Sequence, residues 1–115
     1  MDKHEKSLQL INKFVEDRDW KKFHNPKDMA TALSIEATEL LELFLWVKAG
    51  DLDAHVKNKK EDIKDEMADV AVYLFELADN LDIDIFEAIE EKIKKNGEKY
   101  PIEKCKGNNK KYTEL

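Results

Sequence analysis

The chain has 115 residues, a length typical of one domain, and 40% of these residues are charged. It contains only three glycines and two prolines, a composition that favours long helices over a turn-rich β fold. The net charge of −6 argues against a nucleic-acid or anionic-membrane surface, because both need clustered lysines and arginines. We therefore expect a single helical domain over residues 1–115 that binds neither nucleic acid nor membranes.

The cysteine content and the apolar segments predict a cytoplasmic protein. Cys105 is the only cysteine, so no internal disulfide can form. The N-terminal residues contain no apolar run of signal-peptide length, and no stretch approaches the ~20 apolar residues of a membrane span.

The first part of the chain predicts a short amphipathic helix over about residues 4–17, because its apolar residues recur at helical spacing. A loop carrying the rings of Trp20, Phe23 and His24 should follow. Asn25 and Pro26 are typical of a helix start, with Asn as the cap and Pro at the first helical position.

The second helix is expected to run from Pro26 to about Ala49 and to end at Gly50 in a left-handed conformation. Between Leu40 and Val47 it is apolar on nearly every side, so we expect this segment to be buried. Residues 51–60 are polar and should form a surface connection or the frayed start of the next helix.

A third helix is predicted over about residues 61–81, with an apolar stripe that includes Met67. A fourth helix should open at Asp84, bury Phe86, Ile89 and Ile93, and close at Gly97. Residues 98–115 are expected to form a partly irregular tail. The predicted fold is all-α, a four-helix bundle-like protomer that completes its core by dimerisation or tetramerisation.

Two apolar helices carry acids one turn apart. Glu36 and Glu39 interrupt the second helix, and Glu66 and Asp69 interrupt the third. Residues three apart share a helix face, with β-carbons about 5–6 Å from each other. Most such pairs are solvated, but carboxylates within buried stretches are costly unless a cation lies between them. These four acids therefore predict a metal site.

The residue types at this site favour magnesium, with manganese as a possible substitute. A di-iron carboxylate bundle would need Glu-x-x-His pairs, and no histidine of this chain follows a glutamate at that spacing. Zinc is disfavoured because soft ligands are lacking. Magnesium held by a few carboxylates usually completes its shell with water and substrate phosphates, so we expect phosphoryl or pyrophosphoryl hydrolysis.

The two acid pairs on apolar helices resemble the signature of the all-α nucleoside triphosphate pyrophosphohydrolases, the MazG-like superfamily. The match is closest to its dCTP pyrophosphatase branch and covers nearly the whole chain from Arg18 onward. The segments that carry it are RDWKKFHNP at 18–26, ELLELFLW at 39–46, EMADVAVYL at 66–74, NGEKYP at 96–101 and KYTEL at 111–115.

The resemblance implies hydrolysis of a (d)NTP, with dCTP or a modified dCTP as the expected substrate, between the α and β phosphates to a monophosphate and pyrophosphate, as in nucleotide-pool housecleaning. The four acids Glu36, Glu39, Glu66 and Asp69 would hold the metal, with Glu39 and Glu36 as catalytic candidates and Glu39 positioning the water. A homodimer, or a homotetramer built as a dimer of dimers, is implied as well. The substrate-binding candidates that the resemblance indicates are Trp20, Phe23, His24, Trp46, Lys92, Asn96, Lys99, Tyr100, Lys111 and Tyr112.

The sequence departs from the family pattern at two places. Ile35 and Thr38 stand where glycines are frequent, which could narrow the pocket, and Gly97 and Glu98 replace residues that are usually basic. The structural alternative to substrate binding is that the aromatic residues pack against neighbouring side chains and that the lysines lie on a solvent-exposed helix face. The competing function is a non-enzymatic helical interaction protein with a structural metal site, and a di-metal oxidoreductase is a third alternative.

Overall fold

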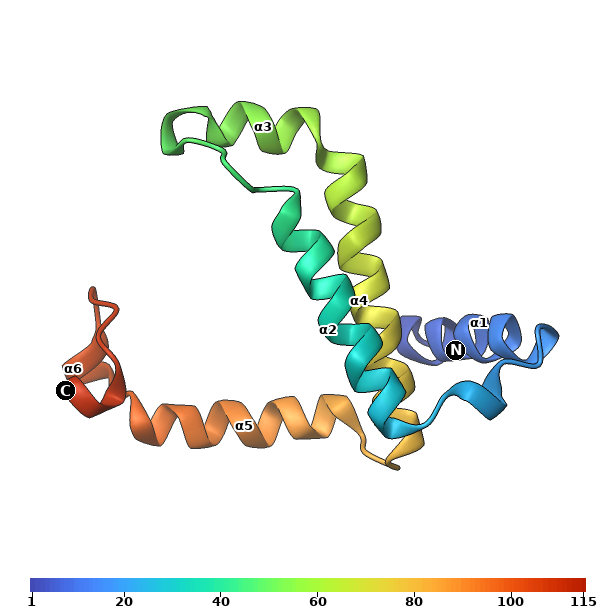
Figure 1. Cartoon of the computed structure of the whole chain (residues 1–115). Helices are drawn as coiled ribbons and strands as arrows, with labels where there is room; N and C mark the ends of the chain where they lie inside the picture. Colours follow the sequence, from blue (N-terminus) through green and yellow to red (C-terminus); the bar gives the residue numbers. More distant parts are fainter. The chain divides into compact units, whose positions relative to one another are not determined.

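The structure is a computed structural model that describes all 115 residues, and every regular element in it is helical (Figure 1). This confirms the predicted all-α class, although the chain forms six α-helices instead of four. The chain divides into two compact units, residues 1–82 and 83–115. The elements are α1 (Lys3–Asp17), η1 (Lys21–Phe23), α2 (Pro26–Glu42), η2 (Ala49–Asp51), α3 (Leu52–Asn58), α4 (Lys60–Asn80), α5 (Ile85–Lys99), α6 (Ile102–Cys105) and η3 (Tyr112–Glu114).

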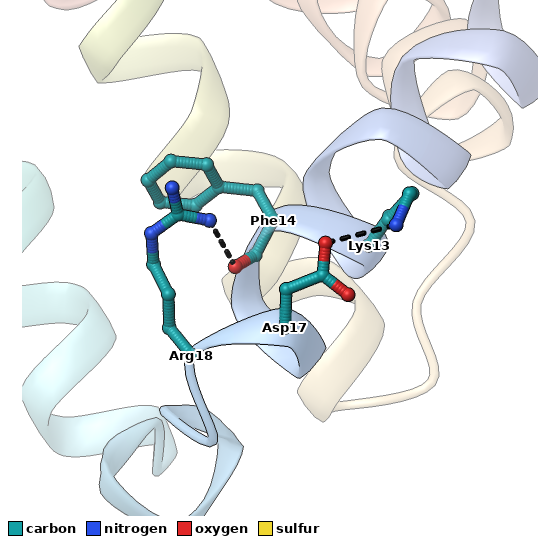
Figure 2. A network of polar contacts seen from close by, with 4 residues as sticks. All are labelled: Lys13, Phe14, Asp17 and Arg18. Carbon is teal, nitrogen blue, oxygen red and sulfur yellow. Dashed lines mark hydrogen bonds and ion pairs between the residues drawn. The ribbon is translucent and has the colours of Figure 1, made fainter.

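Helix α1 is held at both ends by side chains that bind its free backbone groups. Asp2 and Glu5 form a capping box at its start. At its end, the guanidinium of Arg18 donates a hydrogen bond of 3.0 Å to the carbonyl of Phe14. Figure 2 shows this contact beside the ion pair of Lys13 and Asp17. These contacts fix where α1 stops and the chain turns.

The start of α2 is the one predicted. The Asn25 side chain accepts a hydrogen bond of 2.9 Å from the backbone N–H of Asp28, and Pro26 occupies the first helical position. The preceding segment is more regular than the expected loop, because Lys21–Phe23 forms one turn of 3₁₀ helix.

Helix α2 ends at Glu42, so the predicted end at Ala49 and Gly50 was wrong. The backbone tightens into i to i−3 hydrogen bonds over residues 43–47, and Trp46 takes a left-handed conformation with φ 64°. Gly50 lies instead within η2, and its φ is not positive. The polar stretch after it forms a separate helix, α3, whose His55 donates from Nε2 to the carbonyl of Leu43.

Helices α2 and α4 run side by side in opposite directions and form the centre of the first unit (Figure 1). Met29 of α2 and Ala78 of α4 are buried, and Val15 of α1 is buried where α1 packs on α4. The bounds of α4 agree with the predicted third helix. Met67 was expected on its buried stripe but is 57% exposed, because no helix of its own unit covers that side.

The apolar segment over residues 40–47 was expected to be buried and is largely exposed. Trp46 is 88% exposed, and Leu41 and Leu45 are also exposed. The prediction failed because α2 has only one extensive helical neighbour within its unit, which covers one face. None of the helices combines the length and the apolar character that crossing a membrane would require.

The second unit consists of α5, α6 and η3. Asp84 caps α5 by accepting from the backbone N–H groups of Phe86 and Glu87. The predicted stop at Gly97 was wrong: α5 continues to Lys99, because a glycine without positive φ does not break a helix. The predicted inward residues Phe86, Ile89 and Ile93 are exposed as well.

Candidate metal centre and adjoining cavity

Three glutamates converge where α2 and α4 run side by side. Glu36 and Glu39 lie one turn apart on α2, and Glu66 reaches them from α4. One carboxylate oxygen from each lies within 4.8 Å of the others. The i, i+3 spacing puts both α2 acids on one helix face, and the packing of α4 against that face supplies the third.

Two buried carboxylate oxygens of this cluster have no hydrogen-bond partner. Oε2 of Glu36 and Oε2 of Glu66 are buried and accept no hydrogen bond. Burial, together with the neighbouring carboxyls of Glu39 and Glu66, raises the pKa of Glu36 to about 7. Buried polar atoms are normally paired, so this arrangement calls for a proton or a cation.

Asp69, the fourth acid of the predicted set, is not among the three that meet within 4.8 Å. It lies one turn beyond Glu66 on α4, and its side chain is exposed. Its negative charge still adds to the raised pKa of Glu36, and its side chain also lines the cavity described next. Asp69 therefore connects the glutamate cluster to that cavity.

A cation fits the donor set of this cluster. All the converging atoms are carboxylate oxygens, the ligands that Mg²⁺ and Mn²⁺ prefer. The two orphaned buried oxygens are the structural evidence that the protein alone does not satisfy the site. The residues present are thus suited to hold a divalent cation with positions left for other ligands.

An open cavity of about 430 Å³ lies between α1, the loop after it and α4. This volume lies within the range of small-molecule sites. Among the sequence-predicted residues, Trp20, His24 and Asp69 line it. Its other lining residues are Leu10, Ile11, Phe14, Val15, Val72, Tyr73 and Glu76.

The aromatic wall of this cavity is built from Phe14 and Trp20. Their rings meet edge to face with centroids 5.6 Å apart. The guanidinium carbon of Arg18 lies 3.8 Å from the centroid of Phe14, as the stacked side chains in Figure 2 illustrate. The Arg18 guanidinium and the end of α1 together hold the Phe14 ring in place.

Two cavity residues, Tyr73 and Glu76, were missed by the sequence analysis. Burial, followed by the charge of Glu36, raises the pKa of the Tyr73 hydroxyl. Glu76 is only 9% exposed, and its Oε2 lies 3.6 Å from Nδ1 of His24. Burial raises the pKa of Glu76, and His24 opposes that rise. An acid within the apolar second half of α4 was the available signal for Glu76.

The remaining sequence-predicted residues lie outside this cavity. Phe23 and Trp46 are exposed and do not line it. The others belong to the second unit, where Tyr100 and Tyr112 meet with ring centroids 6.1 Å apart. Nζ of Lys99 lies 4.9 Å from the centroid of Tyr112. Lys92, Asn96 and Lys99 lie on α5, and Lys111 directly precedes η3.

Comparison with known proteins gives consistent matches. The model of the MazG-like family matches residues 31–115. Proteins named dCTP pyrophosphatase 1 from Rattus norvegicus, Mus musculus and Homo sapiens are each 34% identical over 109 residues, which cover 93% of this chain. The chain spans only 64% of the length of these curated relatives.

A solved structure is also similar. The crystal structure of a pyrophosphatase from Archaeoglobus fulgidus superposes with a TM-score of 0.83 at 37% sequence identity. The match covers 88% of this chain and 94% of the archaeal one.

Proposed function

Because this chain belongs to the MazG-like family, whose model matches most of its length, we propose that it is a metal-dependent nucleoside triphosphate pyrophosphohydrolase. The observation that carries the proposal is the cluster of Glu36, Glu39 and Glu66 with two orphaned buried oxygens beside an open cavity. The reaction is hydrolysis between the α and β phosphates to a monophosphate and pyrophosphate.

The metal ligands in this proposal are the three converging glutamates, with Asp69 at the cavity side of the cluster. Mg²⁺ is the cation we infer, with Mn²⁺ as a substitute, because the donors are oxygens alone. When bound, such an ion neutralises charge on the phosphates and polarises the phosphoryl group.

Glu39 is the residue we assign to the attacking water, with Glu36 as the second catalytic candidate. The Glu39 carboxylate accepts a proton from the water as the water oxygen bonds to the α-phosphorus. The bond from that phosphorus to the bridging oxygen breaks, and pyrophosphate leaves. Glu36 supports this step by orienting Glu39, since their carboxyls are neighbours.

The nucleobase belongs, in this proposal, in the cavity between α1 and α4. Trp20 offers a ring face for stacking, Phe14 adds apolar surface beside it, and His24 offers a hydrogen-bonding nitrogen. Asp69 connects this cavity to the acids, so a base in the cavity would direct its phosphates toward them. The names of the mammalian relatives favour dCTP, or a modified dCTP, as the substrate.

A second copy of the chain is part of the proposal. Exposed apolar side chains follow the α2 and α4 region, including Ile35, Leu41, Leu45, Trp46 and Met67. A shallow depression of about 360 Å³, lined only by α2, contains both Ile35 and Glu39. A partner helix seated there would cover the apolar face and complete the acid site in a dimer or a dimer of dimers. A substrate-binding role for Phe23 or Trp46 would require this partner.

The candidate phosphate-binding residues of this proposal lie in the second unit. Lys92, Asn96 and Lys99 follow one face of α5 at i, i+4 and i+7 spacing. Tyr100 and Tyr112 pack together beside Lys99, which holds the C-terminal segment against the end of α5. Lys111, next to Tyr112, adds a cation. A phosphate-binding role for these residues stays a prediction.

The test combines the purified protein, Mg²⁺ and a panel of dNTPs, with pyrophosphate as the measured product. We expect release with at least one nucleotide and loss of that release in Glu39→Gln. Glu61→Gln, an exposed acid in the first turn of α4 that lies outside the cluster, is the matched control and should retain activity. Absence of release with every nucleotide would favour the helical interaction protein with a structural metal.

A further inference from the structure

We propose that Glu76 determines which nucleobases the cavity accepts, by taking a hydrogen bond from the exocyclic amino group of the base. The inference rests on the proposed function and extends it to selectivity for amino-bearing over keto bases. Glu76 lies on α4 one turn beyond Tyr73, among the residues that line the cavity of about 430 Å³.

The carboxyl of Glu76 is an unsatisfied group at a ligand-sized cavity. The residue is 9% exposed, and its Oε2 is buried without a hydrogen-bond partner. The nitrogen Nδ1 of His24 lies 3.6 Å from this Oε2, beyond a normal hydrogen bond. Buried carboxyl oxygens are nearly always paired, so this acceptor is available to a donor from a ligand.

The cavity surrounds this acceptor with apolar and aromatic surface. Leu10, Ile11, Phe14 and Val72 line it, and the ring of Trp20 offers a stacking face. A planar, largely apolar ligand that carries one well-placed donor suits such a lining. A nucleobase with an amino group has this chemistry.

The pair of Glu76 and His24 matches one class of base edge. Cytosine and adenine carry an amino donor next to a ring nitrogen that accepts. Glu76 supplies an acceptor, and a His24 nitrogen that carries a proton supplies a donor beside it. Thymine and uracil present a carbonyl oxygen where the amino group would be. Two acceptors would then face each other, which disfavours the keto bases.

The alternative is that Glu76 is satisfied by water and takes no part in recognition. Glu76 also lines a small cavity of about 20 Å³, together with Asn12, Lys21 and Asp79, which is large enough for one water molecule. In that case, neutralising Glu76 would leave base selectivity unchanged.

The test measures kcat/KM of the full chain for dCTP, dATP, dTTP and dUTP in wild type and in Glu76→Gln. The amide can offer its NH₂ group to a carbonyl, so we expect the ratio of amino to keto substrates to fall at least tenfold. Asp79→Asn is the matched control, because it makes the same charge change one turn further along α4 outside the large cavity. It should leave the ratio unchanged. An unchanged ratio in an active Glu76→Gln enzyme would overturn the inference.

Calorimetric binding of dCMP and dTMP separates this inference from the proposed function, because it needs no turnover. Wild type should bind dCMP at least tenfold more tightly than dTMP, and Glu76→Gln should remove that preference. Equal binding of the two monophosphates by wild type would overturn the inference even if pyrophosphate release is observed. Glu76→Leu, checked for native helicity by circular dichroism, provides a second variant without an acceptor and should also lose the preference.

Discussion

A carboxylate oxygen of Glu36 on α2 and one of Glu66 on α4 lie within 4.8 Å of each other, and each residue has a buried Oε2 without a partner. Two acids from different helices would repel each other there if both were ionised and no cation were present. Burial and the neighbouring carboxyls raise the pKa of Glu36 to about 7, so without a metal this carboxyl keeps its proton below that pH.

The first prediction concerns the pH dependence of stability in the metal-free protein. The unfolded chain releases the Glu36 proton near its ordinary pKa of 4.5, whereas the folded protein retains it until about pH 7. The stabilising effect of this protonation is complete below pH 4.5 and is lost as the pH rises through 7. Glu36→Gln removes the effect, so its Tm relative to wild type should rise by several degrees over this interval.

The measurement for this prediction is thermal unfolding in EDTA at several pH values between 4.5 and 7.5. Glu42→Gln, an exposed acid on the same helix, serves as the control and should keep a constant difference from wild type. A constant difference for Glu36→Gln as well would contradict the raised pKa.

The second prediction concerns metal binding. Mg²⁺ should stabilise the wild-type protein, because a ligand that binds only the folded state adds about 2.7 kcal/mol at one hundred times its Kd. Glu66→Gln removes one of the three converging carboxylates and should abolish most of this stabilisation. Differential scanning fluorimetry over a Mg²⁺ titration measures it. Glu61→Gln, which changes an exposed acid in the first turn of α4, is the control and should be stabilised by Mg²⁺ as much as wild type. Full stabilisation of Glu66→Gln by Mg²⁺ would exclude Glu66 as a metal ligand.

The third prediction uses the two tryptophans of the chain as separate reporters. Trp20 lines the cavity, and Trp46 does not. A nucleotide stacked in the cavity should therefore quench the fluorescence of the Trp46→Phe variant, which retains Trp20. It should not quench the fluorescence of the Trp20→Phe variant, which retains only Trp46. Because base stacking contributes about 1–3 kcal/mol, Trp20→Ala should raise KM roughly tenfold or more. The opposite quenching pattern would put the base beside Trp46 instead.

The fourth prediction concerns assembly through the exposed apolar surface of α2 and its neighbour α4. Leu41 and Met67 are 69% and 57% exposed in the single chain, and the proposed partner copy would cover them. A charge at either position would then be buried without a counter-ion, so Leu41→Glu and Met67→Glu should dissociate the oligomer. Light scattering after size-exclusion chromatography measures the mass. Lys57→Glu on α3 controls for added negative charge and should leave the mass unchanged. If Leu41→Glu and Met67→Glu also leave the mass unchanged, the interface does not include this surface.

Local chemistry made several features of this protein predictable from its residues. The Asn25 and Asp84 caps lie where expected, because a capping side chain binds backbone groups only a few residues away. The family resemblance is confirmed by the match over residues 31–115 and by the pyrophosphatase relatives. The acids Glu36 and Glu39 also share a helix face as their spacing requires.

Helix ends and burial were less predictable, because they depend on what packs against each segment. The apolar run around Leu41 gives no sign of the left-handed turn at Trp46, and α5 passes through Gly97 without a break. Expected burial at Met67 and Ile93 presupposed packing partners that each residue lacks within its own unit. The assembly with a second copy stays a prediction, as does the treatment of residues 1–115 as one domain.

The acidic spacing indicated a cluster, but the contacts between α2 and α4 selected its members. Glu66 meets the α2 glutamates while Asp69 lies beside the cavity, a distinction that depends on how the two helices face each other. Glu76 shows the same limit: along the chain it is one acid among 26 acidic residues, and it matters because α1 and the His24 loop bury it. Spacing along a helix sets which side chains share a face, whereas burial and pairing arise from segments that are distant along the chain.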